Sequence, residues 1–350
     1  MAHRFYRTTQ SLYTTILDIL YCWQQTAPLG TPTQVGLIAL YVTGLILLDC
    51  RSTQTRVATF FPARCHDALN RLLRVMPLST RQIMRLLIAF AWGLGCDGYL
   101  CVDDVIVEKA FAKKLSWASW TYSHAKGRHV YGLHIVVLLW CSHDKRWRIP
   151  VAFRLWRPKT SCSPHDYRKK TPLAAQMMKE VLATNLRERI AYIVGDGGYT
   201  AGWLTRLITR LDMQWNGILM PQTNIIRNSK PLTMRDLPGR VRLKWRKEFG
   251  VRASRAITVY APSYGTIRVC VVRMASGTYR YLASNNLQLD VTTMLQRKYS
   301  RWDIETTFRD EKQYGGLESC QCWCDQAMVR HVALVMLTFV LMQRLRVTPT

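Results

Sequence analysis

Two apolar segments with aspartates in or at the end of them most constrain how this chain can fold. Residues 99–107 read YLCVDDVIV and contain Asp103 and Asp104, and residues 189–198 read RIAYIVGDGG and end in Asp196 and two glycines. Their β-branched content predicts strands, in which unpaired carboxylates are costly to bury. An acid at the carboxyl end of a parallel strand is where α/β sheets place chemistry. The two segments therefore predict an α/β sheet with a polar site at one edge.

Each of these acids also has a less specific explanation. Asp103 and Asp104 would suit a turn or the edge of a sheet, and an Asp-Gly pair such as Asp196 and Gly197 occurs in many turns. Neighbouring side chains on a strand point to opposite faces, so only one of Asp103 and Asp104 can face a shared site. Both remain candidates on this ground.

A third acid lies in residues 299–312, YSRWDIETTFRDEK, which lack proline and glycine and therefore predict one helix. At about 100° per residue, Arg301 lies about 40° and Lys312 about 20° from Glu305 around the axis. One face thus carries a guanidinium, a carboxylate and an ammonium, which suits a metal-binding carboxylate beside groups that grip phosphates. Arg301 and Glu305 are also an i,i+4 pair of the kind common on helix surfaces.

The order of Tyr299, Arg301, Glu305 and Lys312 resembles the C-terminal signature of bacterial insertion-sequence transposases, which carry an RNase H-like DDE catalytic domain. That signature separates its four residues by two, three and six positions, whereas this chain has one, three and six. The resemblance covers roughly residues 95–345. It implies an α/β fold in which an RNase H-like mixed sheet is flanked by helices.

The resemblance also implies a set of catalytic acids that hold metal ions. Two Mg²⁺ ions, with Mn²⁺ as a substitute, would be clamped by carboxylates for in-line displacement at phosphorus. Without cations the convergent carboxylates would repel one another. The implied catalytic residues and metal ligands are Asp103, Asp196 and Glu305, with Asp104 as the alternative first ligand.

The implied function is a DNA transposase that binds insertion-sequence ends, cleaves the strands and joins the 3′ ends to target DNA. Arg301 and Lys312 would bind phosphates near the cut, with Tyr299 assisting. The expected partner is double-stranded DNA, both ends and target, bound by a homodimer at the nucleoid in the bacterial cytoplasm. Two alternatives stay open: an RNase H-like nuclease that cuts without joining, and a DNA-binding protein with a defunct site.

The charge of the chain independently favours a polyanionic partner. Its net charge is +27, from 49 Lys and Arg against 22 Asp and Glu, and the basic residues are spread along most of the chain, which favours nucleic acid over a membrane surface. Residues 225–256 hold ten basic and two acidic residues, with Trp245 among them. We expect five of these basic residues to contact DNA phosphates: Arg240, Arg242, Lys244, Arg246 and Lys247.

Four parts are expected along the chain. Residues 1–95 form a helical region, for DNA binding or for dimerisation and packing, with helices expected over residues 12–23, 32–48, 64–75 and 79–94, the last with Ser79 as its N-cap. Residues 96–221 and 293–350 form the two parts of the catalytic core, with a helix expected over residues 173–188 and a closing helix over residues 325–344. Residues 222–292 form a β-rich basic insertion. The longest apolar run, residues 35–48, has 14 residues, fewer than the about 20 that span a bilayer, so no membrane span and no secretory signal are expected. Eleven cysteines without framework spacing are typical of reduced thiols.

Overall fold

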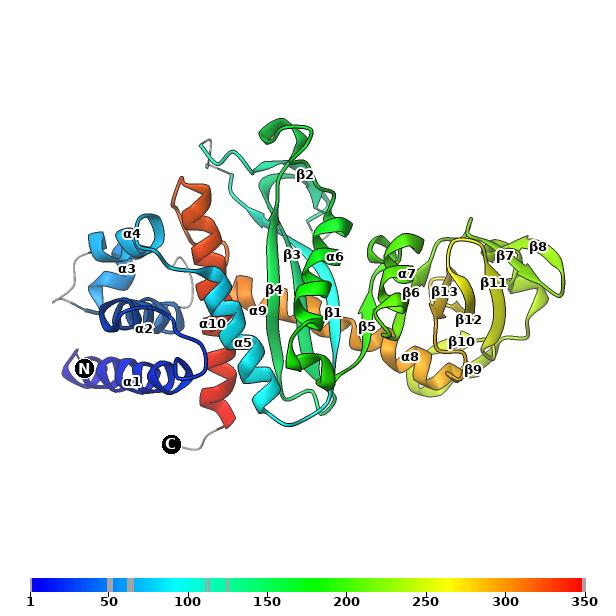
Figure 1. Cartoon of the computed structure of the whole chain (residues 1–350), viewed down its shortest axis with the longest axis horizontal. Coiled ribbons are helices and arrows are strands. Elements are labelled where there is room, and N and C mark those ends of the chain that lie inside the picture. Colours follow the sequence, from blue (N-terminus) through cyan, green and yellow to red (C-terminus); the bar gives the residue numbers. More distant parts are fainter. Residues whose placement is uncertain are drawn as a thin grey trace.

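The computed structural model describes residues 2–48, 53–61, 66–110, 112, 114–123 and 126–347. Three parts follow one another along the longest axis of the molecule (Figure 1). They are a group of helices at the N-terminal side, a central sheet flanked by helices, and a second group of strands at the far end. The arrangement confirms the predicted α/β fold, a mixed sheet flanked by helices.

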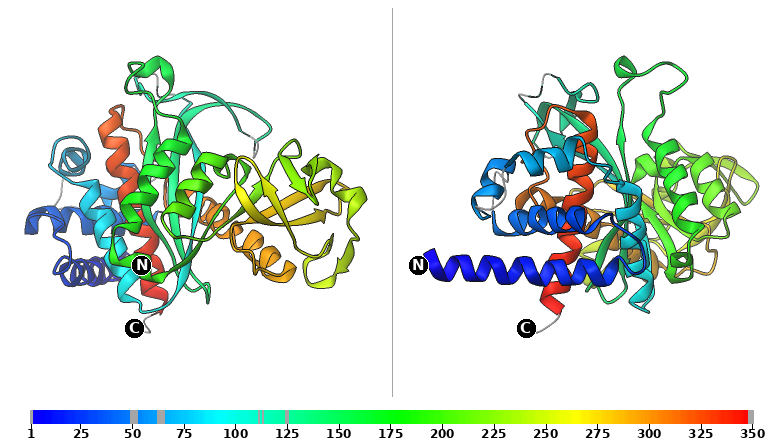
Figure 2. Two further views of the ribbon diagram at one scale, coloured as in Figure 1. Left: turned by 45° about the vertical axis from the view of Figure 1, so that its right-hand side comes forward. Right: turned by 60° about the vertical axis from the view of Figure 1, so that its left-hand side comes forward.

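Helices precede the first strand, and α1 extends away from the rest of the molecule (Figure 2). α5 begins as predicted, because the Ser79 hydroxyl accepts a hydrogen bond from the Gln82 backbone N–H at 3.3 Å. α1 begins earlier than predicted and α3 was not predicted; the start of the helix predicted over residues 64–75 lies outside the described residues. The bounds are α1 (Ala2–Trp23), α2 (Pro32–Leu47), α3 (Gln54–Thr59), α4 (His66–Arg74) and α5 (Thr80–Gly93).

The central strands have an order that brings the ends of two parallel strands together. They are β1 (Gly98–Glu108), β2 (Ser119–Ser123), β3 (Arg128–Ser142), β4 (Arg148–Trp156), β5 (Ile190–Gly195) and β6 (Trp215–Leu219). β1 pairs antiparallel with β3 and parallel with β5, β6 runs parallel to β5, and β4 pairs with β3. Val102 of β1 lies opposite Gly195 of β5. The residues that follow this pair, Asp103 and Asp196, therefore lie at the same level of the sheet.

Two helices connect these strands. α6 (Lys170–Leu182) packs on β3 and β4, and α7 (Gly202–Arg210) packs on β6. The helix predicted over residues 173–188 begins three residues earlier, because Pro172 is accommodated in the first turn, where its missing N–H would have no partner in the helix. It also ends earlier, since residues Asn185–Arg189 form a 3₁₀ turn.

The second group of strands continues the same sheet through antiparallel pairing with β6. Its strands are β7 (Asn224–Arg227), β8 (Lys230–Thr233), β9 (Lys244–Arg246), β10 (Val251–Ala253), β11 (Ile257–Ala261), β12 (Gly265–Arg273) and β13 (Tyr279–Ser284). The main path of the sheet is β2-β3-β1-β5-β6-β13-β12-β11-β7-β8. A small separate core, which includes Val251, Cys270 and Leu282, lies beneath these strands. The fold thus places a β-rich unit between the strand that precedes Asp196 and the helix of Glu305.

The prediction of one helix over residues 299–312 is wrong. The chain forms α8 (Val291–Ser300) and α9 (Trp302–Gln313), and Arg301 caps both. Neither proline nor glycine causes the break. Tertiary bonds hold the end of α8, because the Cys101 thiol donates to the Ser300 carbonyl at 3.7 Å and the Ser300 and Tyr192 hydroxyls are 3.2 Å apart.

The last helix, α10 (Asp325–Val347), is longer than the predicted helix over residues 325–344. By length and composition alone it would be able to cross a membrane, but 78% of its most apolar 18-residue window is buried inside the protein. It packs against α2, α4, α5 and β4. Its apolar side chains are therefore explained by its position in the core of the fold.

Candidate active site

Asp103 lies on the central strand β1 with its carboxylate beside a guanidinium. Its Oδ2 accepts a hydrogen bond from Arg301 Nη1 at 3.1 Å, and its Oδ1 accepts one from the Asp104 backbone N–H at 2.8 Å. Burial, and next the negative charge of Asp196, raise the pKa of Asp103 to about 7. The two predicted strand-end aspartates are thus close enough for the charge of Asp196 to disfavour the charged form of Asp103.

Asp196 occupies the turn that follows β5. Its Oδ1 accepts hydrogen bonds from the backbone N–H groups of Gly198 at 2.8 Å and Tyr199 at 3.2 Å. A Cβ on Gly198 would lie 3.1 Å from that oxygen, so glycine gives the carboxylate room to approach its own turn. These bonds hold the Asp196 side chain at the end of β5, and the side chain remains partly exposed.

Glu305 reaches the aspartates through Arg301. At the junction of α8 and α9 the Arg301 guanidinium donates Nη1 to Asp103, and its Nη2 forms an ion pair with Glu305. Arg301 lies at the junction of the two helices, four residues before Glu305, and its guanidinium also reaches Asp103 on β1. Arg301 and Glu305 are therefore more than a surface pair, because the guanidinium joins the third acid to the first.

Asp104 faces the opposite side of β1. Its Oδ2 accepts a hydrogen bond from Lys170 Nζ at 2.6 Å and its Oδ1 accepts one from the Tyr199 hydroxyl at 3.0 Å. His134 Nδ1 lies 2.8 Å from the same ammonium. Burial alone would raise the pKa of Asp104, but its partners His134, Lys170 and Tyr199 lower it to about 2. Because Lys170 begins α6 and Arg301 precedes α9, these two helices cover opposite faces of the strand.

The sequence offered no signal for Lys170 or His134, which lie far from the aspartates along the chain. Tyr199 was within reach of sequence reasoning, since it stands three residues after Asp196. Its hydroxyl bonds to Asp104 while its backbone N–H bonds to Asp196. One tyrosine therefore ties the turn of the second aspartate to the strand of the first.

Lys312 and Tyr299 are placed apart from the acids. Lys312 Nζ donates to the Ile106 carbonyl at 2.5 Å and forms an ion pair with Glu318 at 3.1 Å. The Tyr299 hydroxyl donates to the Phe249 carbonyl at 3.3 Å, and the two rings are stacked with centroids 5.6 Å apart. Of the three signature residues expected to bind phosphate, the structure brings only Arg301 into contact with the acids.

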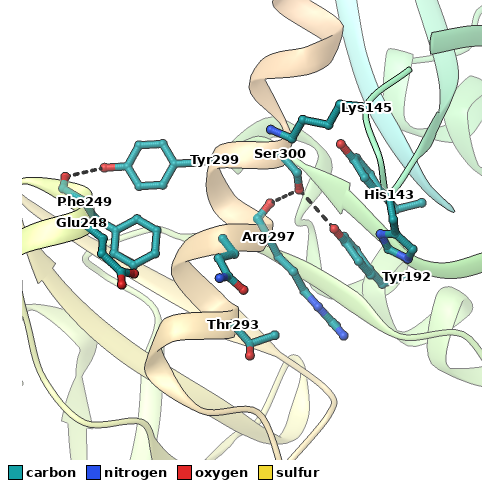
Figure 3. A pocket seen from close by; sticks show the side chains of 11 residues that line it. His143, Lys145, Tyr192, Glu248, Phe249, Thr293, Arg297, Tyr299 and Ser300 are labelled. Carbon is teal, nitrogen blue, oxygen red and sulfur yellow. Dashed lines mark hydrogen bonds between the residues drawn. The ribbon is translucent and has the colours of Figure 1, made fainter. Parts of the chain in front are cut away.

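Tyr299 instead lines a cavity of about 680 Å³ between the central sheet and the second group of strands (Figure 3). The opposite wall carries Tyr99 and Tyr192, whose rings are stacked 5.0 Å apart, and Arg297 lies 4.1 Å above the Tyr192 ring. Lys145 also lines the cavity, on the same side as His143 and Tyr192. The cavity adjoins the end of α8, and Asp103, Asp196 and Glu305 are not among the residues that line it.

The basic residues predicted to contact DNA lie in the second group of strands. Arg240, Arg242, Lys244 and Lys247 are exposed, and Arg246 is half-buried. Trp245 among them is 62% exposed. The cluster is therefore available to a partner, as a phosphate-contacting surface requires.

The donor chemistry of the acids suits a hard divalent cation, because carboxylate oxygens are its preferred ligands. The close approach of Asp103 and Asp196 leaves repulsion that a cation would relieve. Among the described residues, no three His, Cys, Asp or Glu side chains are already arranged to hold a metal ion. The Arg301 guanidinium lies between Asp103 and Glu305 and supplies the positive charge there.

Comparison with known proteins identifies the family. The family described as DDE superfamily endonuclease matches residues 27–268, which are 242 of the 350 residues. This range includes Asp103 and Asp196 and ends before Glu305. No curated protein matches the chain. On this match over more than half of its length, the chain belongs to the DDE superfamily endonuclease family, whose members act on DNA and use divalent metal ions.

Proposed function

We propose that this endonuclease-family protein is a bacterial insertion-sequence transposase. It binds the ends of the element, cleaves the strands and joins the 3′ ends to target DNA. The observation that carries the proposal is the Arg301 guanidinium, which joins Glu305 to an Asp103 that already lies beside Asp196. In this proposal the acids, in the order D, D, E, are supplied by two adjacent parallel strands and one helix.

Asp103, Asp196 and Glu305 would hold the metal ions, two Mg²⁺ with Mn²⁺ as a substitute. When bound, such ions supply Lewis-acid stabilisation to the attacking and leaving oxygens of a phosphoryl transfer. Gly198 and Tyr199 keep the Asp196 carboxylate oriented through their N–H groups. Buried Asp103, whose pKa is about 7, must lose its proton before it can act as an anionic ligand at neutral pH.

Asp104 would act as a positioning residue and not as a ligand. It is held by Lys170 and faces away from Arg301, while its bond to the Tyr199 hydroxyl fixes the turn that carries Asp196. Asp103 is therefore the first catalytic acid in this proposal. With cations bound to the acids, the Arg301 guanidinium would no longer be needed as their partner. It would then be able to bind a DNA phosphate, because a guanidinium binds phosphate with a bidentate fork.

DNA would be gripped by several separate groups. Lys312 and Tyr299 would each add a contact away from the acids, and the basic cluster from Arg240 to Lys247 would extend the positive surface over the second group of strands. The four parts expected from the sequence, 1–95, 96–221, 222–292 and 293–350, stay part of the proposal, as do a homodimer on DNA and action in the cytoplasm at the nucleoid.

The test uses strand cleavage and joining on DNA that carries the element's ends, with Mg²⁺, beside a gel-shift assay. Glu305→Gln keeps the size of the side chain but removes its charge, so cleavage should fall by about 10³-fold or more through loss of several kcal/mol of transition-state stabilisation. DNA affinity should persist, since Lys and Arg supply it. Lys312→Ala should instead weaken the DNA complex and leave Mn²⁺ binding intact.

Glu188→Gln is the matched control, because Glu188 is an exposed carboxylate on the 3₁₀ turn before β5. If Glu305→Gln cleaves at the wild-type rate, the Arg301–Glu305 pair has only a structural role. Cleavage without joined products would favour the nuclease that cuts and does not join, and binding without cleavage by the wild-type chain would favour a DNA-binding protein with a defunct site.

A further inference from the structure

A second hollow lies at the outer edge of the central sheet, and neither Arg301 nor the three candidate acids line it. It is a groove of about 740 Å³ over the outer edge of β4, between α5 and α6 and beside the start of α10. Figure 1 shows α5 and α6 on either side of β4. β4 pairs only with β3 among the described strands, so its other edge borders the groove.

Arginines from three elements surround this groove. Arg81 and Arg85 come from α5, Arg154 from β4, and Arg157 from the segment just after β4. Glu180 of α6 is the acidic side chain that lines it, and it forms an ion pair with Arg154. Four guanidiniums against one carboxylate leave a surplus of three positive charges around one hollow.

The placement of Arg81 and Arg85 is unfavourable for the protein alone. They are exposed and stand four residues apart on α5, where like charges repel and cost about 0.2–0.5 kcal/mol. Among the described residues, neither forms an ion pair or a side-chain hydrogen bond. Both guanidiniums are therefore free to bind an anion from outside the chain.

Arg157 shows that the groove is partly ordered in advance. Its guanidinium lies 4.3 Å from the centroid of the Trp117 ring, a contact that holds the planar group while leaving its N–H donors free at the rim. Arg154 is similarly held through Glu180 and through the Phe153 carbonyl, to which its Nη1 donates at 2.8 Å. Guanidiniums fixed in this way lose less freedom when they bind phosphate.

We propose that this arginine groove binds the phosphate backbone of duplex DNA, as a second contact separate from the candidate active site. Paired guanidiniums match phosphate oxygens. A second copy of this chain would bring more positive charge, since each copy carries +27, so self-association through the groove is disfavoured. The inference deepens the proposed function by giving DNA a second surface, and it rests on that function only for the choice of DNA as the polyanion.

The experiment compares two arginine pairs in the full chain. Arg81→Ala/Arg85→Ala empties the α5 side of the groove, and Arg206→Ala/Arg210→Ala is the matched control, because these two exposed residues also stand four apart on a helix, α7. Affinity for a 30-base-pair duplex is measured by fluorescence anisotropy at several salt concentrations. Circular dichroism checks that each variant is folded.

The α5 pair should lower DNA affinity by about tenfold or more, since hydrogen bonds to charged groups are among the stronger ones. The slope of log K against log salt should become shallower by about 1.8, which corresponds to two lost phosphate contacts. Arg157→Ala should make it shallower by about 0.9. Equal affinities and slopes in the α5 and α7 variants would overturn the inference.

Two further measurements test whether an acidic protein segment or a second copy of this chain binds in the groove instead of DNA. If the α5 pair instead abolishes binding of a polyglutamate peptide and leaves DNA binding unchanged, the groove serves an acidic segment of a protein and the inference fails. It also fails if sedimentation shows that the α5 pair alters self-association at unchanged DNA affinity. Cleavage by the candidate active site is scored separately, so a chain that binds DNA through the groove but does not cut would refute only the proposed function.

Discussion

The two faces of β1 carry adjacent aspartates in opposite electrostatic states. Asp103 faces Arg301 and Asp196, and its pKa is raised to about 7, whereas Asp104 faces Lys170 and His134 and its pKa is lowered to about 2. Both side chains are similarly shielded, with 15% and 21% of their surfaces exposed. Burial therefore does not distinguish them; the partners that each face provides do.

Under the proposed function, Asp103 would take part in the chemistry and Asp104 would stabilise the fold. Asp104 is satisfied by an ammonium and a hydroxyl, and its charge is already neutralised. Asp103 is held next to a second carboxylate, so its charged form is strained by burial and by Asp196. A group kept in an unfavourable charged state is a candidate for cation binding, and perturbed pKa values often mark functional sites.

The largest expected effect is on cleavage. Asp103→Asn should lower the rate by about 10³-fold or more, because a neutral amide cannot contribute charge to a cation site. Asp104→Asn should lower it by only about tenfold, through a less well placed Asp196 turn. Single-turnover cleavage of end-containing DNA measures both rates. Equal losses would abolish the contrast between the two faces.

The second effect is on stability at pH 7, where Asp104→Asn should cause the larger change and Asp103→Asn the smaller one. Asp104→Asn should lower the free energy of unfolding by about 2 kcal/mol, because it leaves Lys170 without its charged partner in a largely shielded place. Asp103→Asn should change it less, or raise it. Urea unfolding measures both, and Lys170→Met combined with Asp104→Leu serves as the control, since removing both charges should restore part of the loss.

The third comparison is the pH dependence of stability in metal-free buffer, where the contribution of Asp104 should be of the same size as the loss expected for Asp104→Asn. The lowered pKa of Asp104 stabilises the fold above pH about 4, and this contribution of about 2 kcal/mol should disappear as pH falls toward 2. The raised pKa of Asp103 has the reverse sign: the folded state holds its proton longer, so stability should fall as pH rises from about 4 to about 7.

Unfolding free energies of the wild type and the two Asn variants across pH 2–8 check these signs. The difference between wild type and Asp104→Asn should shrink below pH 4, and the difference between wild type and Asp103→Asn should change between pH 4 and 7. Parallel pH curves for the three proteins would show that neither aspartate has a shifted pKa.

The sheet and its acids could be predicted from the sequence because their signals are local. The apolar runs around Asp103 and before Asp196 predicted strands, and both exist as β1 and β5. The basic cluster and Ser79 were also visible in the sequence, since charge density and capping need only near neighbours. The break at Arg301 was missed because bonds from Cys101 and Tyr192, far away in the chain, hold Ser300.

The sequence alone predicts an α/β protein with a large positive charge, two strands that carry aspartates and a helical Arg-Glu pair. Only the tertiary structure decided which way each aspartate points. Neighbouring side chains on a strand point to opposite faces, so the sequence does not show which of two adjacent acids lies on a given face. The choice depends on which partner reaches each face: Lys170 at the start of α6 bonds to Asp104 and Arg301 before α9 bonds to Asp103, and both partners are more than 60 positions away in the chain.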